Sequence, residues 1–209
     1  MDGIKKKSRV VEANNFLNRN TPLELFAKWF AEAKSSSLSF PDAFVLSTVG
    51  KKSQPNSRVL LLKEIRKNGM IFYTNYQSVK GQEMTANKKV ALSFFWDHLF
   101  RQVTWHGKVK KISRAESQKY WASRPRESQL SQWVSQQSKP VTSRARLERD
   151  LATAKALFAD KEIPLPKNWG GYIFIPTYVE FWIGRDGRFH DRYAYLKVEN
   201  EWRGHRLYP

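Results

Sequence analysis

The chain has 209 residues, of which 41% are hydrophobic and 14% aromatic, enough for one substantial core, and its lack of cysteine excludes disulfides, thiolate metal sites and a cysteine nucleophile. No apolar run approaches the ~20 residues that a membrane span needs, and the N-terminus lacks the apolar run of a secretory signal, so we expect a soluble cytoplasmic protein with no membrane partner. The 37 Lys and Arg against 19 Asp and Glu give a net charge of +18, which indicates either a phosphate-rich partner (nucleic acid or a phosphorylated small molecule) or a basic surface that only keeps the protein soluble.

The first expected element is a helix that begins after Thr21. Residues 1–20 are predicted to form a flexible basic arm in front of it. Thr21 is suited to be an N-cap, because Pro22 follows at the first helical position and Glu24 stands at the third. The segment SSSLSFPD ends this helix, and we expect a single domain over residues 21–209.

β-Branched and aromatic runs, separated by turn signals, dominate the rest of the chain. Helical patterns interrupt them in the middle of the sequence. This order favours a mainly β (α+β) fold, a small antiparallel barrel with flanking helices, over a parallel doubly wound sheet. The expected strands span residues 43–49, 57–65, 70–75, 90–96, 101–112, 171–176, 178–183, 191–198 and 201–207, and the expected helices span residues 78–88, 114–124, 128–136 and 143–159.

The segment RVLLLK in the second expected strand is apolar on both faces. Leu60 and Leu62 point to one side of the strand, and Val59 and Leu61 point to the other. A strand of this kind must be covered on both sides. One side can face the barrel interior, whereas the other needs a helix or a second subunit, so we expect a homodimer.

Several familiar motifs are absent from the sequence. It has no GxGxxG, no GxxxxGK[ST], no HExxH and no GxSxG. Its four histidines have no ligand-like spacing, so no metal site is expected. Any bound phosphate must therefore be held mainly by side chains, for which arginine and lysine are best suited.

Cations and one amide stand at the ends of expected strands and helices. Arg58 and Lys63 bracket RVLLLK and, five residues apart, lie on opposite faces. Lys80 lies near the start of a helix, where free backbone N–H groups favour an anion. Gln102 opens a strand and could hydrogen-bond the edge of a heteroaromatic ring. Charged groups at strand ends also commonly face water, so the residues alone leave both interpretations open.

Tyr120 and Arg124 are four residues apart in AESQKYWASRPRESQ and are expected on one helical face. Pro125 then turns the chain and can bring Ser128 beside them. A phenol, a guanidinium and a hydroxyl together would suit one phosphate monoester. The alternative is a partly exposed helix in which Tyr120 stacks on the core.

The stretch GRDGRFHDRYAY, residues 184–195, is dense in charge. In an extended strand, Arg188, His190 and Arg192 would lie on one face. Two cations beside an imidazole repel one another unless an anion lies between them. The stretch is therefore either a solvated hairpin or the wall of an anion site.

Taken in chain order, the motifs RVLLLK, FYTN…SxKG, RQV, YxxxRPRxSQ, WVSQQS, WGGY, EFW and RxHDR resemble the pyridoxine/pyridoxamine 5'-phosphate oxidase family over about residues 21–209. The resemblance implies a split β-barrel fold and a homodimer with FMN between the subunits. It implies oxidation of pyridoxine 5'-phosphate and pyridoxamine 5'-phosphate, both small phosphorylated pyridines, to pyridoxal 5'-phosphate, with O2 as acceptor and H2O2 released. A related FMN oxidase acting on a phenazine precursor is one alternative. A basic nucleic-acid-binding module is the alternative from another class, and the resemblance argues against a nucleic-acid partner.

By the same resemblance, Arg188 and His190 would be catalytic and lie over the substrate ring. The residues implied to bind substrate are Lys63, Tyr120, Arg124, Ser128, Arg188 and His190. The residues implied to bind FMN are Arg58, Lys63, Tyr73, Thr74, Lys80, Gln102, Gln137, Ser138, Trp182 and Arg192.

The chain departs from the family pattern in two places. Ser78-Val79-Lys80-Gly81 stands where the family usually has Ser-Arg-Lys-Gly, which implies a weaker grip on the FMN phosphate. The N-terminal segment that helps to cover the substrate in the family is not recognisable in residues 1–20.

Overall fold

The computed structural model describes residues 21–209, so the arm expected over residues 1–20 lies outside the described residues. Helix α2 (Pro22–Ser35) begins with the expected capping box. The Thr21 hydroxyl accepts a hydrogen bond from the Glu24 N–H, and the Glu24 carboxylate accepts one from the Thr21 N–H. The two residues thereby satisfy backbone donors that the first helical turn would leave unpaired.

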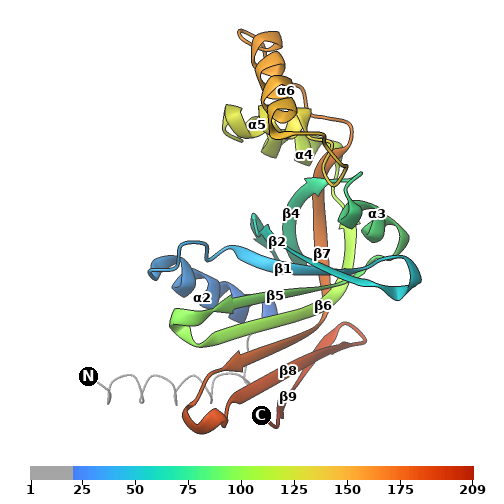
Figure 1. Ribbon diagram of the computed structural model, residues 1–209. Helices are drawn as coiled ribbons and strands as arrows, with labels where there is room; N and C mark the ends of the chain where they lie inside the picture. The colour runs from blue at the N-terminus through green and yellow to red at the C-terminus, as the bar shows by residue number, and fades with distance from the viewer. Residues whose placement is uncertain (1–20) are drawn as a thin grey trace.

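A nine-stranded antiparallel sheet forms the body of the molecule (Figure 1). Seven strands follow one another in the order β2-β1-β5-β6-β7-β4-β3, and β8 pairs with β7 while β9 pairs with β8. This confirms the prediction of a mainly antiparallel split barrel. The strands are β1 (Ala43–Val49), β2 (Pro55–Leu61), β3 (Glu64–Arg66), β4 (Gly69–Asn75), β5 (Lys89–Trp96), β6 (Arg101–Lys111), β7 (Trp169–Ile183), β8 (Asp191–Val198) and β9 (Glu201–Leu207).

The strand expected over residues 57–65 is divided at a corner that curls the sheet. The Leu62 N–H donates to the Asp42 carbonyl, whereas the Lys63 N–H donates to the Ile71 carbonyl. The backbone thus changes its hydrogen-bonding partner from the start of β1 to β4 within two residues. Through this corner β2 runs directly into β3, and these two strands stand at opposite ends of the strand order. The prediction of one unbroken strand was wrong, because hydrophobic alternation does not reveal a change of pairing partner.

The two strands expected over residues 171–176 and 178–183 form the single long strand β7. Pro176 has no N–H to give to a sheet, and such residues are tolerated at bulges. Here the register with β6 shifts between His106 and Gly107, which face Tyr178 and Pro176. The bulge lets β7 continue past the proline, with β4 beside its first half and β8 beside its second half.

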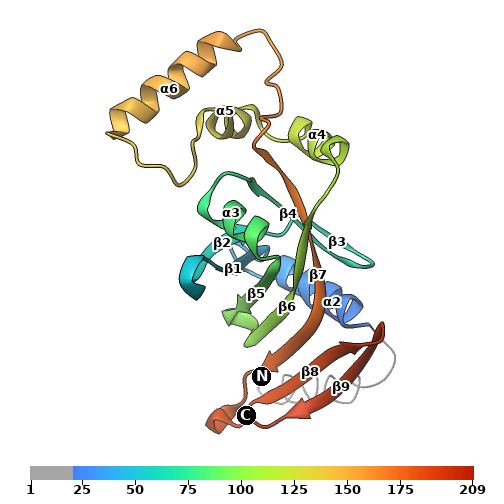
Figure 2. The same cartoon turned by 90° about the vertical axis from the view of Figure 1, so that its right-hand side faces the viewer.

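Helices α4 (Arg114–Ala122), α5 (Arg126–Val134) and α6 (Arg144–Leu157) gather at one end of β7, and the β8–β9 hairpin lies at the other end (Figures 1 and 2). The helix expected over residues 114–124 ends two residues earlier than predicted. A residue that precedes proline is disfavoured in helical conformation, and Arg124 precedes Pro125. Arg124 therefore lies in the turn between α4 and α5, and it does not continue the helical face of Tyr120 as we expected.

The main core fills the concave side of the sheet beneath α2. Phe26 of α2 packs on Phe94 and Trp105, with ring centroids 4.9 and 5.4 Å away. The sulfur side chains of Met70 and Met84 are also buried in this core. Within residues 21–209, no helix is long and apolar enough to cross a membrane.

The outer face of β1, β2 and β5 stays exposed in the single chain. Val59 is 62% exposed and Phe95 63% exposed, while Leu62 on the inner side is buried. Val45 and Leu61 lie on the same outer face and are about two-fifths exposed. The two-sided hydrophobicity of RVLLLK is therefore matched by a covered inner face and an open outer face.

Candidate active site

Helix α3 (Val79–Ala86) begins in a cluster of polar groups from distant parts of the chain. The Lys80 ammonium donates to the Ser78 hydroxyl at 3.2 Å and to Gln137 Oε1 at 2.8 Å. The Ser138 hydroxyl accepts a hydrogen bond from the Val79 N–H at 3.3 Å, and Ser138 has a left-handed φ of 73°. The segment containing Gln137 and Ser138 is thus held against the first turn of α3.

Glycine is required in this turn by close packing. A Cβ at Gly81 would lie 2.4 Å from the Tyr76 carbonyl oxygen and 2.6 Å from the Asn75 carbonyl oxygen. Any larger residue would push α3 away from Asn75, the last residue of β4, and from Tyr76, which follows it. The glycine that follows Lys80 therefore fixes the position of this lysine.

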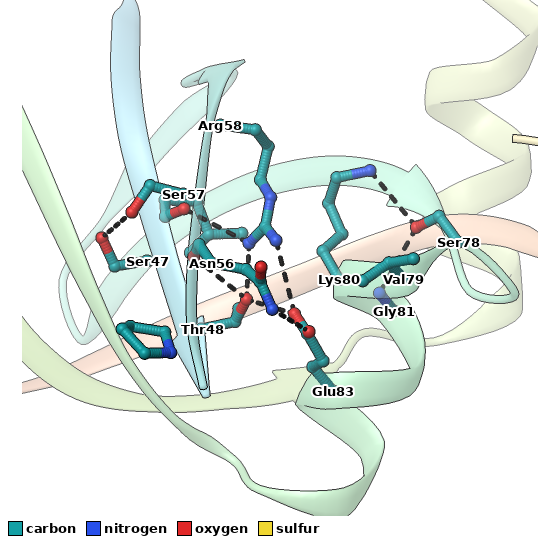
Figure 3. A network of polar contacts seen from close by, with 12 residues as sticks. Ser47, Thr48, Asn56, Ser57, Arg58, Ser78, Val79, Lys80, Gly81 and Glu83 are labelled. Atoms are coloured by element: carbon teal, nitrogen blue, oxygen red, sulfur yellow. Dashed lines mark hydrogen bonds and ion pairs between the residues drawn. The ribbon is translucent and has the colours of Figure 1, made fainter. Parts of the chain in front are cut away.

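Arg58 of β2 reaches the same region and is held by an acidic residue of α3 (Figure 3). Glu83 accepts hydrogen bonds from Arg58 Nη2 at 3.3 Å, from the Thr48 hydroxyl at 2.5 Å and from Asn56 Nδ2 at 2.6 Å. The Arg58 guanidinium also donates to Thr48. Glu83 thereby orients Arg58 beside Lys80.

Burial, with a further contribution from Arg58, lowers the pKa of the Lys80 ammonium to about 8. Glu83 acts in the opposite direction but is paired with Arg58, so the Lys80 ammonium has no carboxylate partner of its own within residues 21–209. The cluster of Arg58, Lys80, Gln137 and Ser138, called the α3 cluster below, therefore has the charge and the donors that fit a phosphate group.

A second group lies in one row across three strands. Gln102 of β6 is opposite Trp182 of β7, which is opposite Arg192 of β8. Arg192 donates to both oxygens of the Glu180 carboxylate, at 2.7 and 3.0 Å, and these bonds raise its pKa. The indole ring of Trp182 lies 4.6 Å from the imidazole ring of His190. These residues place an amide, an indole and a guanidinium neutralised by Glu180 side by side across the ends of β6, β7 and β8.

The segment before Arg192 is not extended as we expected. Arg188 ends a short 3-10 helix, η3 (Asp186–Arg188), and has a left-handed φ of 61°. His190 follows in a turn, and its Nδ1 accepts a hydrogen bond from the Arg185 N–H at 3.1 Å. The prediction that Arg188, His190 and Arg192 share one strand face was wrong, because Gly187 turns the chain before β8 begins. Arg188 is exposed at the tip of this loop.

A third group surrounds a cavity of about 410 Å³ on one side of α5, called the α5 cavity below. Arg124 and Ser128 line it together. Burial lowers the pKa of the Arg124 guanidinium, which lies 4.8 Å from the Trp169 ring. Its buried Nη1 has no hydrogen-bond partner within residues 21–209. The cavity therefore contains a desolvated cation that lacks an acceptor.

The remaining candidates have structural contacts of their own. Tyr73 stacks on Tyr120, 3.9 Å away, and on Trp169, 5.3 Å away, and Tyr120 does not line the α5 cavity. Thr74 is buried in β4. The Lys63 ammonium pairs with Asp42 at 3.1 Å, at the corner between β2 and β3.

A single chain does not bring all the candidates to one cavity. Arg124 lines the α5 cavity, whereas Lys63 and Arg188 line neither this cavity nor the one of about 590 Å³ between α5 and α6. Across residues 21–209, no group of three or more His, Asp or Glu residues could hold a metal ion. The sequence analysis missed Glu83 and Glu180, which hold the two arginines; acidic residues next to an expected cation site were the available signal.

Two family models cover most of the chain. The model described as pyridoxamine 5'-phosphate oxidase matches residues 31–158. The model described as pyridoxine 5'-phosphate oxidase C-terminal dimerisation region matches residues 169–209. A pyridoxine/pyridoxamine 5'-phosphate oxidase of Shewanella sediminis is 46% identical over 189 residues, which are 90% of this chain and 89% of the relative.

Solved structures share the fold. PhzG from Burkholderia lata 383, in complex with tetrahydrophenazine-1-carboxylic acid, superposes with a TM-score of 0.87 at 28% identity and covers 91% of this chain and 94% of its own. A pyridoxamine 5'-phosphate oxidase-related, FMN-binding protein from Nostoc punctiforme has a TM-score of 0.75 at 16% identity, over 92% of this chain and all of its own.

Replacing Glu83 by leucine should lower the free energy of unfolding by about 2 kcal/mol, because it leaves the partly buried Arg58 and Asn56 without their acceptor. Urea denaturation at one fixed protein concentration measures this change. The matched control is Glu148→Leu, which removes an exposed ion pair with Arg144 and should change stability by about 0.5 kcal/mol or less. Equal effects of the two substitutions would show that Glu83 does not hold Arg58 in place.

Proposed function

The chain belongs to the pyridoxamine 5'-phosphate oxidase family, and on this premise we propose that it is the FMN-dependent enzyme that oxidises pyridoxine 5'-phosphate and pyridoxamine 5'-phosphate to pyridoxal 5'-phosphate. The observation that carries the proposal is the presence of two separate cationic sites, each suited to one phosphate. The α3 cluster fits the phosphate of FMN, and the α5 cavity fits the phosphate of the substrate.

The cofactor site rests on the chemistry of the α3 cluster. Lys80 supplies positive charge beside Arg58, whose own charge Glu83 offsets, and the positive end of the α3 dipole and the Ser138 hydroxyl lie next to it. Gln102 and Trp182 would contact the flavin ring, with Arg192 beside them. Tyr73, Thr74 and Lys63 are assigned to the cofactor by family resemblance, and their contacts in the single chain are structural.

We assign the active enzyme to a homodimer. The candidates form separate groups in one chain, and the outer face of β1, β2 and β5 exposes Val45, Val59, Leu61 and Phe95. The family's C-terminal dimerisation region corresponds to β7–β9, which carry Trp182, His190 and Arg192. A second copy packed on the apolar face would cover it and could bring groups of the two chains together.

The protein's own residues bind the substrate, orient it and donate hydrogen bonds to it. FMN, when bound, supplies the two-electron acceptor for the oxidation. Arg124 and Ser128 hold the substrate phosphate, and this fixes the pyridine ring relative to the cofactor; Tyr120 is assigned to the phosphate by family resemblance. The hydrogen bond from the Arg185 N–H to His190 Nδ1 leaves the N–H of a neutral imidazole on Nε2, from where it can donate a hydrogen bond to the substrate. Arg188, on the same loop, balances negative charge on the substrate.

We propose O2 as the final electron acceptor. Oxidation of the alcohol then consumes one O2 and releases one H2O2. Oxidation of the amine consumes one O2 and one water and releases H2O2 and ammonia. Both reactions give the same aldehyde.

The test is the visible spectrum and the turnover of the purified protein. We expect flavin absorption and equal amounts of aldehyde and H2O2 from pyridoxamine 5'-phosphate. A phenazine precursor serves as the competing substrate, since PhzG shares the fold. A yellow protein that oxidises only the phenazine precursor would overturn the assignment, and a colourless protein that binds DNA in a salt-sensitive manner would point to the other class.

Arg188→Ala should lower kcat with pyridoxamine 5'-phosphate by about 10- to 100-fold while leaving the flavin spectrum unchanged, because Arg188 orients the substrate and does not hold the cofactor. Steady-state kinetics and the ratio of flavin to protein measure the two effects. Arg149→Ala, which removes an exposed cation of α6, is the control and should behave like the wild type. Unchanged turnover in Arg188→Ala would refute the role.

The affinity for FMN should fall as the pH rises above about 8. Below this pH, Lys80 carries a proton and attracts the phosphate dianion; above it, binding must first return the proton, which weakens affinity by up to about tenfold per pH unit. Quenching of FMN fluorescence by FMN-free protein between about pH 7 and 9 measures the affinity. Lys80→Met should bind more weakly and with little dependence on pH. A flat wild-type profile would contradict the role of Lys80.

A further inference from the structure

The polar face of α5 continues past the residues assigned to the substrate phosphate. Ser128, Ser131 and Gln132 are three or four residues apart and project from the same side of the helix, and Ser135 follows directly after its last residue. All four line the α5 cavity together with Arg124 and Glu127. The opposite side of α5 packs its apolar residue Leu130 into a core with α4 and α6. The sequence of α5 thus gives it one apolar side and one side of hydroxyls and an amide.

Two residues that line the α5 cavity each have a buried donor with no acceptor. Nη1 of Arg124 and Nε2 of Gln132 are both inaccessible to solvent and make no hydrogen bond within residues 21–209. A buried donor without an acceptor costs about 1–3 kcal/mol, and more when it is charged. Arg124 and Gln132 both line the α5 cavity, and a ligand with acceptors would supply the partner that each donor lacks once its side chain turns toward the cavity.

The chemistry of the lining defines this ligand. Glu127 is the one carboxylate among the residues lining the cavity, and it is largely exposed and paired with Lys155 at 3.0 Å. The serine hydroxyls can rotate to donate, and Arg124 supplies the charge. A phosphate monoester has several acceptors and a double negative charge, and therefore matches this set.

We propose that Gln132 is a specificity-determining residue, whose side-chain amide donates to the substrate phosphate next to Arg124 and Ser128. This inference rests on the proposed function and adds a residue that the sequence analysis did not single out. An amide donates a hydrogen bond to the phosphate dianion and is itself uncharged, whereas a carboxylate at the same position would repel the dianion. Gln132 thereby raises selectivity for phosphorylated over unphosphorylated pyridines.

Gln132→Met, which keeps the length of the side chain and removes the amide, tests the proposal. KM for pyridoxamine 5'-phosphate should rise about tenfold while kcat changes by less than about twofold. Binding of 4-deoxypyridoxine 5'-phosphate, which cannot be oxidised at the 4-position, should weaken about tenfold in calorimetry, and binding of unphosphorylated 4-deoxypyridoxine should not change. The flavin content should equal that of the wild type.

Two further variants complete the experiment. Gln132→Glu should weaken the binding of 4-deoxypyridoxine 5'-phosphate more than Gln132→Met does. If the methionine variant does not fold, the same comparison of the two probes in Gln132→Glu tests the proposal. Gln136→Met, at an exposed glutamine in the loop after α5 that does not line the α5 cavity, is the matched control and should leave the binding of both probes unaffected. Equal loss of affinity for both probes, or no loss for either, would overturn the role of Gln132. A wild-type protein that binds the phosphorylated probe but does not oxidise pyridoxamine 5'-phosphate would instead overturn the proposed function.

Discussion

Pairing of β6 with β7 along nearly the whole length of β6 is the constraint on which the rest of the molecule depends. β7 begins at Trp169, which contacts the aromatic stack and Arg124, and it ends at Ile183, next to the loop of Arg188 and His190. The bulge at Gly107 allows this pairing to pass Pro176 unbroken. One continuous ladder therefore fixes the distance between the helical end of the molecule, with its phosphate-binding cavity, and the loop that carries the proposed catalytic residues.

The site residues that matter most are held at a cost to the fold. Lys80 and Arg124 are cations taken out of water, and burial lowers the pKa of both. Arg58 and Arg192, by contrast, have carboxylate partners in Glu83 and Glu180. Arg58 and Arg192 are thus neutralised within the protein, whereas Lys80 and Arg124 are available to bind an anionic ligand. This division explains how a strongly basic protein can leave most of its positive charge on the surface and use only a few buried cations for recognition.

The sequence predicted the strands at the ends of the chain to the residue, because β1, β8 and β9 are short, alternating and bounded by clear turn signals. It did not predict the corner at Leu62 and Lys63 or the union of two strands in β7, since both depend on which strand the chain pairs with. The helix boundary at Ala122 follows from Pro125, and a stricter use of that residue would have placed Arg124 correctly. The strand was expected only from residue 191, and the extended backbone considered for Arg188 and His190 before it does not form, because Gly187 turns the chain. Lys80 was expected near the start of a helix, and it lies in the first turn of α3. The bond from Lys80 to Gln137 and the bond from the Val79 N–H to Ser138 join segments almost sixty residues apart, and no local pattern reveals them.

The absence of cysteine and the burial of methionine affect how well the protein resists oxidation during turnover. Peroxide is a product of the proposed reaction, and thiols and thioethers are the side chains it damages first. The chain contains no cysteine, and Met70 and Met84 are enclosed in the core beneath α2. The core therefore shields these thioethers from the peroxide released at the active site. The buried methionines should be oxidised only slowly over many catalytic cycles.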